Sequence, residues 1–333
     1  MLDTRNRPLR DLRISVTDRC NFRCTYCMPK EAFGSDYEFL PRANLLTFEE
    51  IDRLARVAVS LGVTKVRLTG GEPLMRAGIS SLVRMLREIP GITDLTMTTN
   101  GSMLTRHADS LAAAGLDRVS VSLDAIDDDV FRSMNDVGFG VRGVLEGIEA
   151  AAYAGLGPIK INAVVKRGVN AHAVLEMARY FRGTGHILRF IEFMDVGTKN
   201  GWRLDDVVSG MEILRLIHAR FPLEPMEPMY AGEVARRYRY ADGAGEIGII
   251  ASVTAPFCGG CTRLRISAEG SAYTCLFASS GRNLRSLLRS GSGDAALQTT
   301  LEELWAERSD RYSEVRSEHT DRPERVEMSY IGG

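Results

Sequence analysis

The sequence predicts an α/β protein: an incomplete, TIM-like (β/α)6 barrel followed by a C-terminal extension. Three observations support this fold class. Strand and helix patterns alternate through six units within residues 13–192, which is typical of a parallel sheet whose strands are joined by helices. Within the strands, apolar and polar residues alternate. After Glu192 the alternation of strands and helices stops, and turn-forming residues become frequent.

The strands and helices follow one another in a regular order. The first strand, 12–16, leads into a cysteine-rich loop. Thr47 and Glu50 have the spacing of a capping box, which predicts a helix that ends near Gly62. A strand over 65–69 runs into Gly-Gly-Glu-Pro at 70–73 and then a helix to about residue 88. The remaining predicted elements are strand 94–98, helix 104–114, strand 118–123, helix 141–154, strand 159–165, helix 172–181 and strand 186–191.

The alternation within the strands predicts which side chains face the barrel interior. One parity packs against the helices and the other faces inward. In the sixth strand this pattern is less regular, because Arg189 shares its parity with Ile187 and Ile191. The inward parity is cationic and includes Arg13, Lys65, Arg67, Lys160 and Arg189. Since unpaired buried charge is costly, the interior should be wet or hold a polyanion. The alternative is that these polar faces are simply exposed to solvent.

Beyond the sixth strand we expect a second region. A turn-rich stretch near 195–210 predicts a boundary between a barrel of residues 1–200 and an extension of residues 201–333. In the extension we expect a helix over 210–220, a proline-rich stretch over 222–228, and strands over 233–240 and 246–250 that belong to a smaller appendage.

The composition excludes several classes of function. Charged residues make up 26% of the 333 residues and the net charge is −1, so we expect no nucleic acid and no membrane as a partner. No apolar run reaches the ~20 residues of a membrane span, and the N-terminus has no apolar targeting core. We therefore expect a cytoplasmic protein.

Six cysteines form two triplets. Cys20, Cys24 and Cys27 follow the first strand at C-x₃-C-x₂-C spacing. Closely spaced thiols in a protein expected to stay in a reducing compartment indicate metal rather than disulfides. Three thiolates without a nearby fourth ligand suit a four-iron cluster with one open iron. A zinc loop with a remote fourth ligand, unrelated buried cysteines and three disulfides are the alternatives.

The second triplet is Cys258, Cys261 and Cys275. Zinc with one added ligand is one interpretation, and a second four-iron cluster with its own open iron is the other. Arg263 and Arg265 share one strand face directly after Cys261. Guanidinium groups bind phosphate or carboxylate with two parallel hydrogen bonds, so we expect this strand to bind an anion.

The first cysteine loop, with Tyr26 before its last cysteine, and the Gly-Gly-Glu-Pro turn resemble the radical S-adenosylmethionine (SAM) enzymes. The resemblance implies that SAM chelates the open iron and that one electron releases a 5'-deoxyadenosyl radical from it. By the same resemblance the SAM-binding residues are Tyr26, Gly71, Glu72, Ser122 and Met194.

Both triplets, Arg-x-Arg after Cys261 and the closing Gly-Gly together resemble the GTP 3',8-cyclase family of molybdenum cofactor biosynthesis. That resemblance implies two 4Fe–4S clusters, SAM, and GTP as substrate. The radical would take hydrogen from ribose C3', and C3' would then attack guanine C8 to give 3',8-cyclo-7,8-dihydro-GTP. The implied partners are a reductant such as flavodoxin or ferredoxin and a downstream cyclic pyranopterin monophosphate synthase; a homodimer is also compatible with the sequence.

The family resemblance also assigns residues. It makes Arg13, Gly332 and Gly333 catalytic, with the C-terminal tail reaching into the active site. The implied GTP-binding residues are Arg13, Lys65, Arg67, Thr98, Lys160, Arg189, Arg263 and Arg265. Two other functions stay open: a radical SAM enzyme that modifies a peptide or protein and carries an auxiliary cluster, and a non-enzymatic protein for electron transfer or metal storage.

Overall fold

One sheet organises the computed structural model, which describes residues 1–230, 232–316 and 324–333. Its six central strands are all parallel and adjacent in chain order. They are β1 (Asp11–Ser15), β2 (Lys65–Thr69), β3 (Asp94–Thr99), β4 (Arg118–Ser122), β5 (Lys160–Val165) and β6 (Ile187–Glu192). The predicted six-unit barrel is therefore confirmed.

The C-terminal region extends this sheet at both edges. β10 (Arg263–Ile266) pairs in parallel with β1, and β9 (Glu246–Ile250) pairs in parallel with β6. Antiparallel strands then continue outward: β11 (Ser271–Tyr273) and β12 (Arg282–Asn283) beyond β10, and β8 (Arg236–Tyr240) and β7 (Leu223–Met226) beyond β9.

The expectation that strands near 233–240 and 246–250 form a separate appendage is thus wrong, because they belong to the barrel sheet. The proline-rich stretch over 222–228 contains the outermost strand β7. An edge strand tolerates Pro225 because one side of its backbone has no strand to bond. The division into residues 1–200 and 201–333 stays a prediction.

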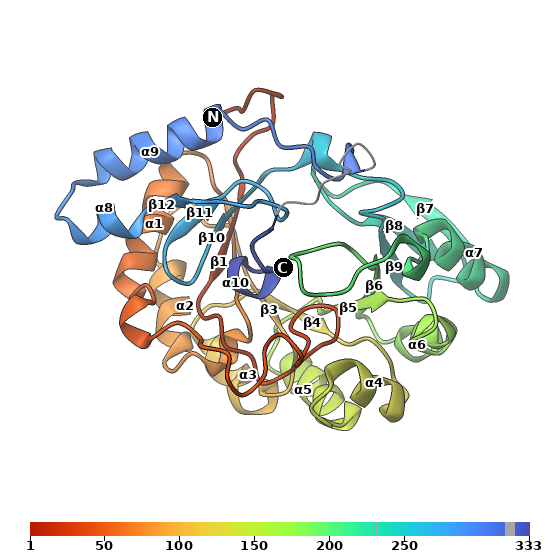
Figure 1. Ribbon diagram of the computed structural model, residues 1–333. Coiled ribbons are helices and arrows are strands. Elements are labelled where there is room, and N and C mark those ends of the chain that lie inside the picture. The colour runs from red at the N-terminus through yellow and green to blue at the C-terminus, as the bar shows by residue number, and fades with distance from the viewer. Residues whose placement is uncertain (231, 317–323) are drawn as a thin grey trace.

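Helices cover the outer face of the sheet and leave its concave side to the loops and the C-terminal region (Figure 1). The capping box is confirmed at the start of α1, where Thr47 Oγ1 accepts a hydrogen bond from Glu50 N at 3.2 Å. The α-helices are α1 (Phe48–Ser60), α2 (Ile79–Arg87), α3 (Leu104–Ala113), α4 (Asp128–Asn135), α5 (Val141–Tyr153), α6 (Val174–Phe181), α7 (Gly210–Arg220), α8 (Arg285–Arg289), α9 (Asp294–Ala306) and α10 (Met328–Ile331).

The core lies between the barrel strands and these helices. The outward parity of the strands is apolar and buried, as predicted; it includes Leu12, Ile14, Val66, Leu68, Leu95, Met97, Val119 and Val121. Burying this apolar face holds the strands in register, because a slip of one residue would turn every side chain to the opposite face. Within the described residues, no helix has the length and apolarity needed to cross a bilayer.

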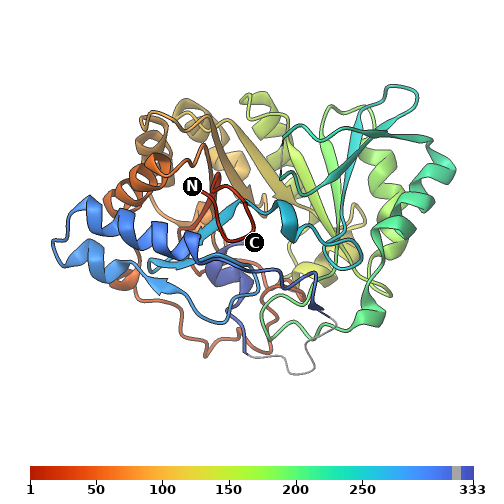
Figure 2. The ribbon, with the colours of Figure 1, turned by 90° about the horizontal axis from the view of Figure 1, so that it is seen from above.

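The C-terminal tail enters the barrel. Both views place α10 and the chain end at the centre of the molecule, on the concave side of the sheet (Figure 1, Figure 2). Ile331 and Gly332 are buried. The tail therefore lies beside the inward-facing side chains of the strands.

Candidate active site

A cavity of about 490 Å³ fills the concave side of the sheet. It is lined by all six cysteines and by every one of the predicted GTP-binding residues. Tyr26, Gly71, Ser122, Met194 and Gly333 also line it. The inward parity predicted from the sequence therefore faces one cavity, rather than open solvent.

The two cysteine triplets lie at opposite ends of this cavity. Cys20, Cys24 and Cys27 follow the C-terminal end of β1, whereas Cys258 and Cys261 precede β10, which runs parallel to β1. Cys275 follows β11, which is antiparallel to β10 and so returns to the end where β10 begins. β1 has five residues, and a strand of that length spans roughly 17 Å.

All six cysteines are free thiols, which excludes the three disulfides considered above. In the described residues no group of His, Cys, Asp or Glu is arranged to hold a single metal ion, so zinc gains no support at either triplet. Zn–S bonds of about 2.3 Å would draw the thiols together, whereas a 4Fe–4S cluster binds each cysteine to a separate iron. Three free thiols at each end of the cavity fit the donor set of such a cluster.

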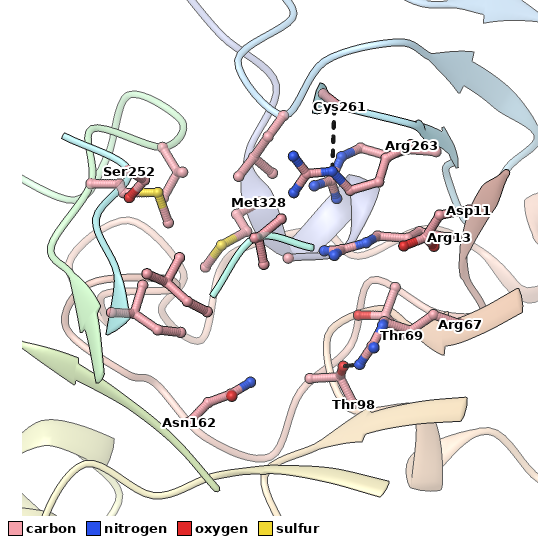
Figure 3. A pocket seen from close by; sticks show the side chains of 18 of the residues that line it. Asp11, Arg13, Arg67, Thr69, Thr98, Asn162, Ser252, Cys261, Arg263 and Met328 are labelled. Carbon is pink, nitrogen blue, oxygen red and sulfur yellow. Dashed lines mark hydrogen bonds between the residues drawn. The ribbon is translucent and has the colours of Figure 1, made fainter. Parts of the chain in front are cut away.

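The two triplets differ in electrostatic environment. Burial raises the pKa of Cys20 to about 11, and burial with nearby Asp124 raises the pKa of Cys24 well above its usual range. At Cys261 burial acts in the same direction, but the Arg263 and Arg308 guanidiniums lower the pKa to about 6. Cys261 is therefore a ready thiolate at neutral pH, and it accepts a hydrogen bond from Arg263 Nε at 3.3 Å (Figure 3).

Three arginines form a row across neighbouring strands between the triplets. Arg13 on β1 is in register with Arg265 on β10 and with Arg67 on β2. Arg67 Nη1 donates to Thr98 Oγ1 at 2.9 Å and to Ser120 Oγ at 3.1 Å. These partners are neutral, so they satisfy donors without balancing charge. Figure 3 shows Arg13 and Arg67 reaching into the same space.

The row is cationic, and Asp11 on β1 offsets only part of its charge. Burial and then the neighbouring Arg265 cation lower the pKa of Arg13 well below its usual range. The Nε atoms of Arg13 and Arg67 are buried without a hydrogen-bond partner. Across the cavity, Lys160 adds a buried cation and Arg189 a half-buried one, and burial with neighbouring cations lowers the pKa of Lys160 to about 7. A site of this kind favours a multiply charged anion.

Acidic residues also line the cavity, and they were not among the site residues predicted from the sequence. Asp11 lines the cavity in register with Arg263 and Lys65, and its Oδ1 has no hydrogen-bond partner. Asp94 pairs with Lys65 at 3.1 Å and with Arg118 at 2.6 Å. Asp11 shares its strand parity with Arg13, so the same alternation that selected the arginine was sufficient to find it.

The Gly-Gly-Glu-Pro turn packs against the cysteine loop. A Cβ at Gly71 would overlap the carbonyl oxygen of Arg19, and Gly70 has φ +147°. The glycines therefore allow the loop that carries the first triplet to lie directly on the end of β2. Both glycines also line the cavity, and the role of Gly71 in binding SAM stays a prediction.

Glu72 is buried within this turn and does not line the cavity. Its carboxylate accepts hydrogen bonds from Thr99 Oγ1 at 2.8 Å and from Asn100 N at 2.7 Å. Burial raises the pKa of Glu72 to about 7. In this arrangement Glu72 joins the ends of β2 and β3, and a direct role in binding SAM stays a prediction.

The tail contacts the arginine row directly. The carbonyl oxygen of Gly332 accepts a hydrogen bond from Arg265 Nη1. Gly332 has φ +74°, and a Cβ there would overlap the side chain of Thr69. A side chain at this position would displace Thr69 on β2, which gives a structural reason for glycine at 332.

Comparison with known proteins supports one family along the whole chain. Residues 14–181 match the radical SAM superfamily, and residues 186–314 match the family described as Molybdenum Cofactor Synthesis C. The GTP 3',8-cyclase of Acidothermus cellulolyticus is 52% identical over 99% of this chain and 98% of its own length. That of Xanthomonas axonopodis pv. citri is 52% identical over 100% of this chain and 99% of its own length.

A solved structure agrees with the fold. Streptococcus suis SuiB bound to S-adenosylmethionine superposes with a TM-score of 0.64, covering 96% of this chain and 76% of that chain at 15% identity. At this identity the likeness concerns the fold alone. The full-length matches and the two family regions together establish that this chain belongs to the radical SAM superfamily and, within it, to the GTP 3',8-cyclase family of molybdenum cofactor biosynthesis.

Proposed function

We propose that the cavity holds GTP and SAM side by side between two 4Fe–4S clusters, and that the chain converts GTP to 3',8-cyclo-7,8-dihydro-GTP. The observation that carries this proposal is the row formed by Arg265, Arg13 and Arg67, which lies between two sets of free thiols at opposite ends of one cavity. A peptide substrate would have no need of such a row.

The triphosphate of GTP lies against the cationic residues. The guanidinium forks of Arg13, Arg67 and Arg265 donate to phosphate oxygens, and Lys160 and Arg189 complete the charge on the facing strands. Phosphate then supplies the hydrogen-bond partners that the Nε atoms of Arg13 and Arg67 lack. Because the three arginines project from adjacent strands in fixed register, they fix the position of the triphosphate between the two ends of the cavity.

The three cysteines at each end of the cavity would hold one cluster. When bound, SAM and the cluster at Cys20, Cys24 and Cys27 supply a 5'-deoxyadenosyl radical, which takes a hydrogen atom from ribose C3'. Tyr26, Ser122 and Met194 line the cavity at the same end and position SAM there. The base of GTP points toward Cys258, Cys261 and Cys275, which would hold the second cluster beside it.

The protein's further task is to hold the reacting carbons in contact and keep water out. The tail serves this task, because Gly332 contacts Arg265 and Gly333 lines the cavity. Together with Arg13, these glycines are the proposed catalytic residues. A reductant such as flavodoxin or ferredoxin supplies the electron, and a cyclic pyranopterin monophosphate synthase consumes the product.

Anaerobic reconstitution with iron and sulfide, followed by GTP, SAM and dithionite, tests the proposal. We expect 5'-deoxyadenosine and the cyclised nucleotide to form together, with no cyclised product when ATP replaces GTP. Formation of 5'-deoxyadenosine only in the presence of a peptide would favour the peptide-modifying alternative. Absence of SAM cleavage in a fully reconstituted protein would contradict the proposal.

A further inference from the structure

The loop that follows β6 carries a buried carboxylate that binds the C-terminal region. Asp195 comes directly after Met194 and is 3% exposed. Its side chain accepts hydrogen bonds from Tyr312 Oη at 2.5 Å, from Arg316 Nε at 2.9 Å and from Arg325 Nη1 at 3.1 Å. Arg325 Nη1 also donates to the carbonyl oxygen of Asp195 at 2.8 Å. One aspartate thus joins the loop to residues far along the chain.

A second contact joins the same two segments. Glu327 accepts hydrogen bonds from Thr198 N at 2.9 Å and from Thr198 Oγ1 at 3.1 Å. A Cβ at Gly197 would overlap the Glu327 carboxylate, and Gly197 has φ +63°. Glycine at this position therefore gives the carboxylate access to the loop. The loop residues Asp195, Gly197 and Thr198 and the tail residues Arg325 and Glu327 together form what we call the tail clasp.

Aromatic side chains support the clasp from the side of the second triplet. Arg325 stacks over the Tyr312 ring at 4.1 Å and donates to its hydroxyl at 2.6 Å. Tyr312 packs against Phe277 with ring centroids 4.6 Å apart, and Phe277 lies two residues after Cys275. The clasp therefore contacts both the loop of Met194 and the segment that follows the second triplet.

The tail residues of the clasp lie only a few residues before the terminal glycines, so the clasp can determine where these glycines lie. Between Glu327 and Gly332 lies only α10, a helix of four residues. A helix this short is not stable by itself in water, so its position must come from tertiary contacts: Ser329 and Ile331 are buried along its length, and both of its ends are held as well. At one end Gly332 meets Arg265, and at the other the clasp fixes Arg325 and Glu327.

We propose that the tail clasp is a positioning device for the reaction: Asp195 and Glu327 hold the tail so that Gly332 and Gly333 stay beside the reacting groups. This inference rests on the proposed function and deepens it. Since Asp195 adjoins Met194, the clasp also couples the tail to the loop that lines the SAM end of the cavity. None of the clasp residues reacts; they act through the position of the tail.

The test compares Asp195→Asn and Glu327→Gln with the wild-type chain. Each change keeps the size of the side chain and removes its charge. Glu212→Gln is the matched control, because Glu212 forms an ion pair with Arg167 on the exposed surface. Hydrogen exchange followed by mass spectrometry is the first readout. We expect exchange in peptides from 324–333 to become roughly tenfold faster in both clasp variants, with barrel peptides unchanged.

The second readout is the ratio of 5'-deoxyadenosine to cyclised nucleotide, which shows how much SAM cleavage leads to product. In a clasp variant we expect more 5'-deoxyadenosine per cyclised nucleotide and a lower kcat, with the KM for GTP within about twofold of wild type. Glu212→Gln should match the wild type in both readouts. The effects of Asp195→Asn and Arg325→Gln on tail exchange should be less than additive in the double variant, since both changes weaken the contact between Asp195 and Arg325.

Unchanged tail exchange in both variants, or an unchanged ratio of 5'-deoxyadenosine to product, would overturn the clasp. Faster exchange throughout the barrel would also overturn it, because the residues would then serve general stability. A wild-type protein that forms no cyclised product would instead refute the proposed function. The exchange experiment on the tail does not depend on that outcome.

Discussion

Replacing Arg265 with alanine should weaken GTP binding more than any loss of surface charge. Arg265 is 2% exposed and lies in register with Arg13, with Arg67 one strand further along the row. Burial and then the neighbouring Arg263 cation lower the pKa of Arg265 to about 10. The group therefore stays charged at neutral pH, in an environment that disfavours its charge until an anion arrives.

The magnitude follows from two effects with the same sign. A hydrogen bond to a charged group contributes about 1.5–3 kcal/mol, and the guanidinium fork can make two such bonds to one phosphate. In the free protein Arg265 is repelled by Arg13 and Arg263, and a bound phosphate offsets this repulsion. Because Arg265→Ala removes the repulsion beforehand, the free energy gained when GTP binds becomes smaller still. The lost contact with the Gly332 carbonyl offsets part of this. We expect a net loss of about 2–3 kcal/mol, or a Kd for GTP roughly 30- to 150-fold higher.

Anaerobic isothermal titration calorimetry of the reconstituted protein measures this change. Arg142→Ala is the control, since it also removes one positive charge but from a side chain 89% exposed on α5. Arg265→Lys should fall between wild type and Arg265→Ala, because it keeps the charge and loses the fork. SAM cleavage should remain measurable in Arg265→Ala. A Kd for GTP equal to that of Arg142→Ala would refute the role assigned to the arginine row.

Three further predictions concern other parts of the cavity. The pKa of Lys160 is lowered to about 7 by burial and nearby Arg189, so the free protein loses this charge as pH rises through 7. GTP affinity should therefore fall between about pH 6.5 and 8.5 more steeply in wild type than in Lys160→Met. Equal slopes in the two proteins would contradict this prediction. Gly71→Ala should lower the free energy of unfolding by about 1–3 kcal/mol in urea, whereas Gly293→Ala, with open space around it, should have little effect. Replacing Cys258, Cys261 and Cys275 together by alanine should reduce bound iron from about eight to about four per chain and preserve SAM cleavage; an unchanged iron content would remove the second cluster from the proposal.

The inward face of the barrel could be predicted from the sequence because its signal is local. A period of two along each strand assigned Arg13, Lys65, Arg67 and Lys160 to one side, and burying the opposite apolar side leaves no other choice. The direction of the Arg189 side chain was harder to predict, since Arg189 shares its parity with two isoleucines, yet it faces the cavity too. Here the side chain follows the register with β5, where Arg189 pairs with Asn162.

What the sequence could not predict depends on contacts between distant residues. β9 and β10 continue the barrel sheet on both sides, and no local pattern distinguishes an added barrel strand from a strand of a separate unit. α4 was missed although Asp127 caps it by accepting from Val130 N at 2.9 Å, because eight residues give too short a period to recognise. The contact of Asp195 with Arg325 joins positions 130 residues apart and has no signature in either segment.

The register of β1 limits how the length of this chain can vary. Removing or adding one residue within Asp11–Ser15 would turn Arg13 toward the helices and bring Leu12 into the cavity, while the neighbouring strands kept their places. Such a change would break the arginine row and bury a cation in the core at once. Insertions and deletions should therefore be tolerated in surface loops such as residues 241–245 between β8 and β9, and a single-codon deletion in β1 should be more harmful than any one arginine substitution.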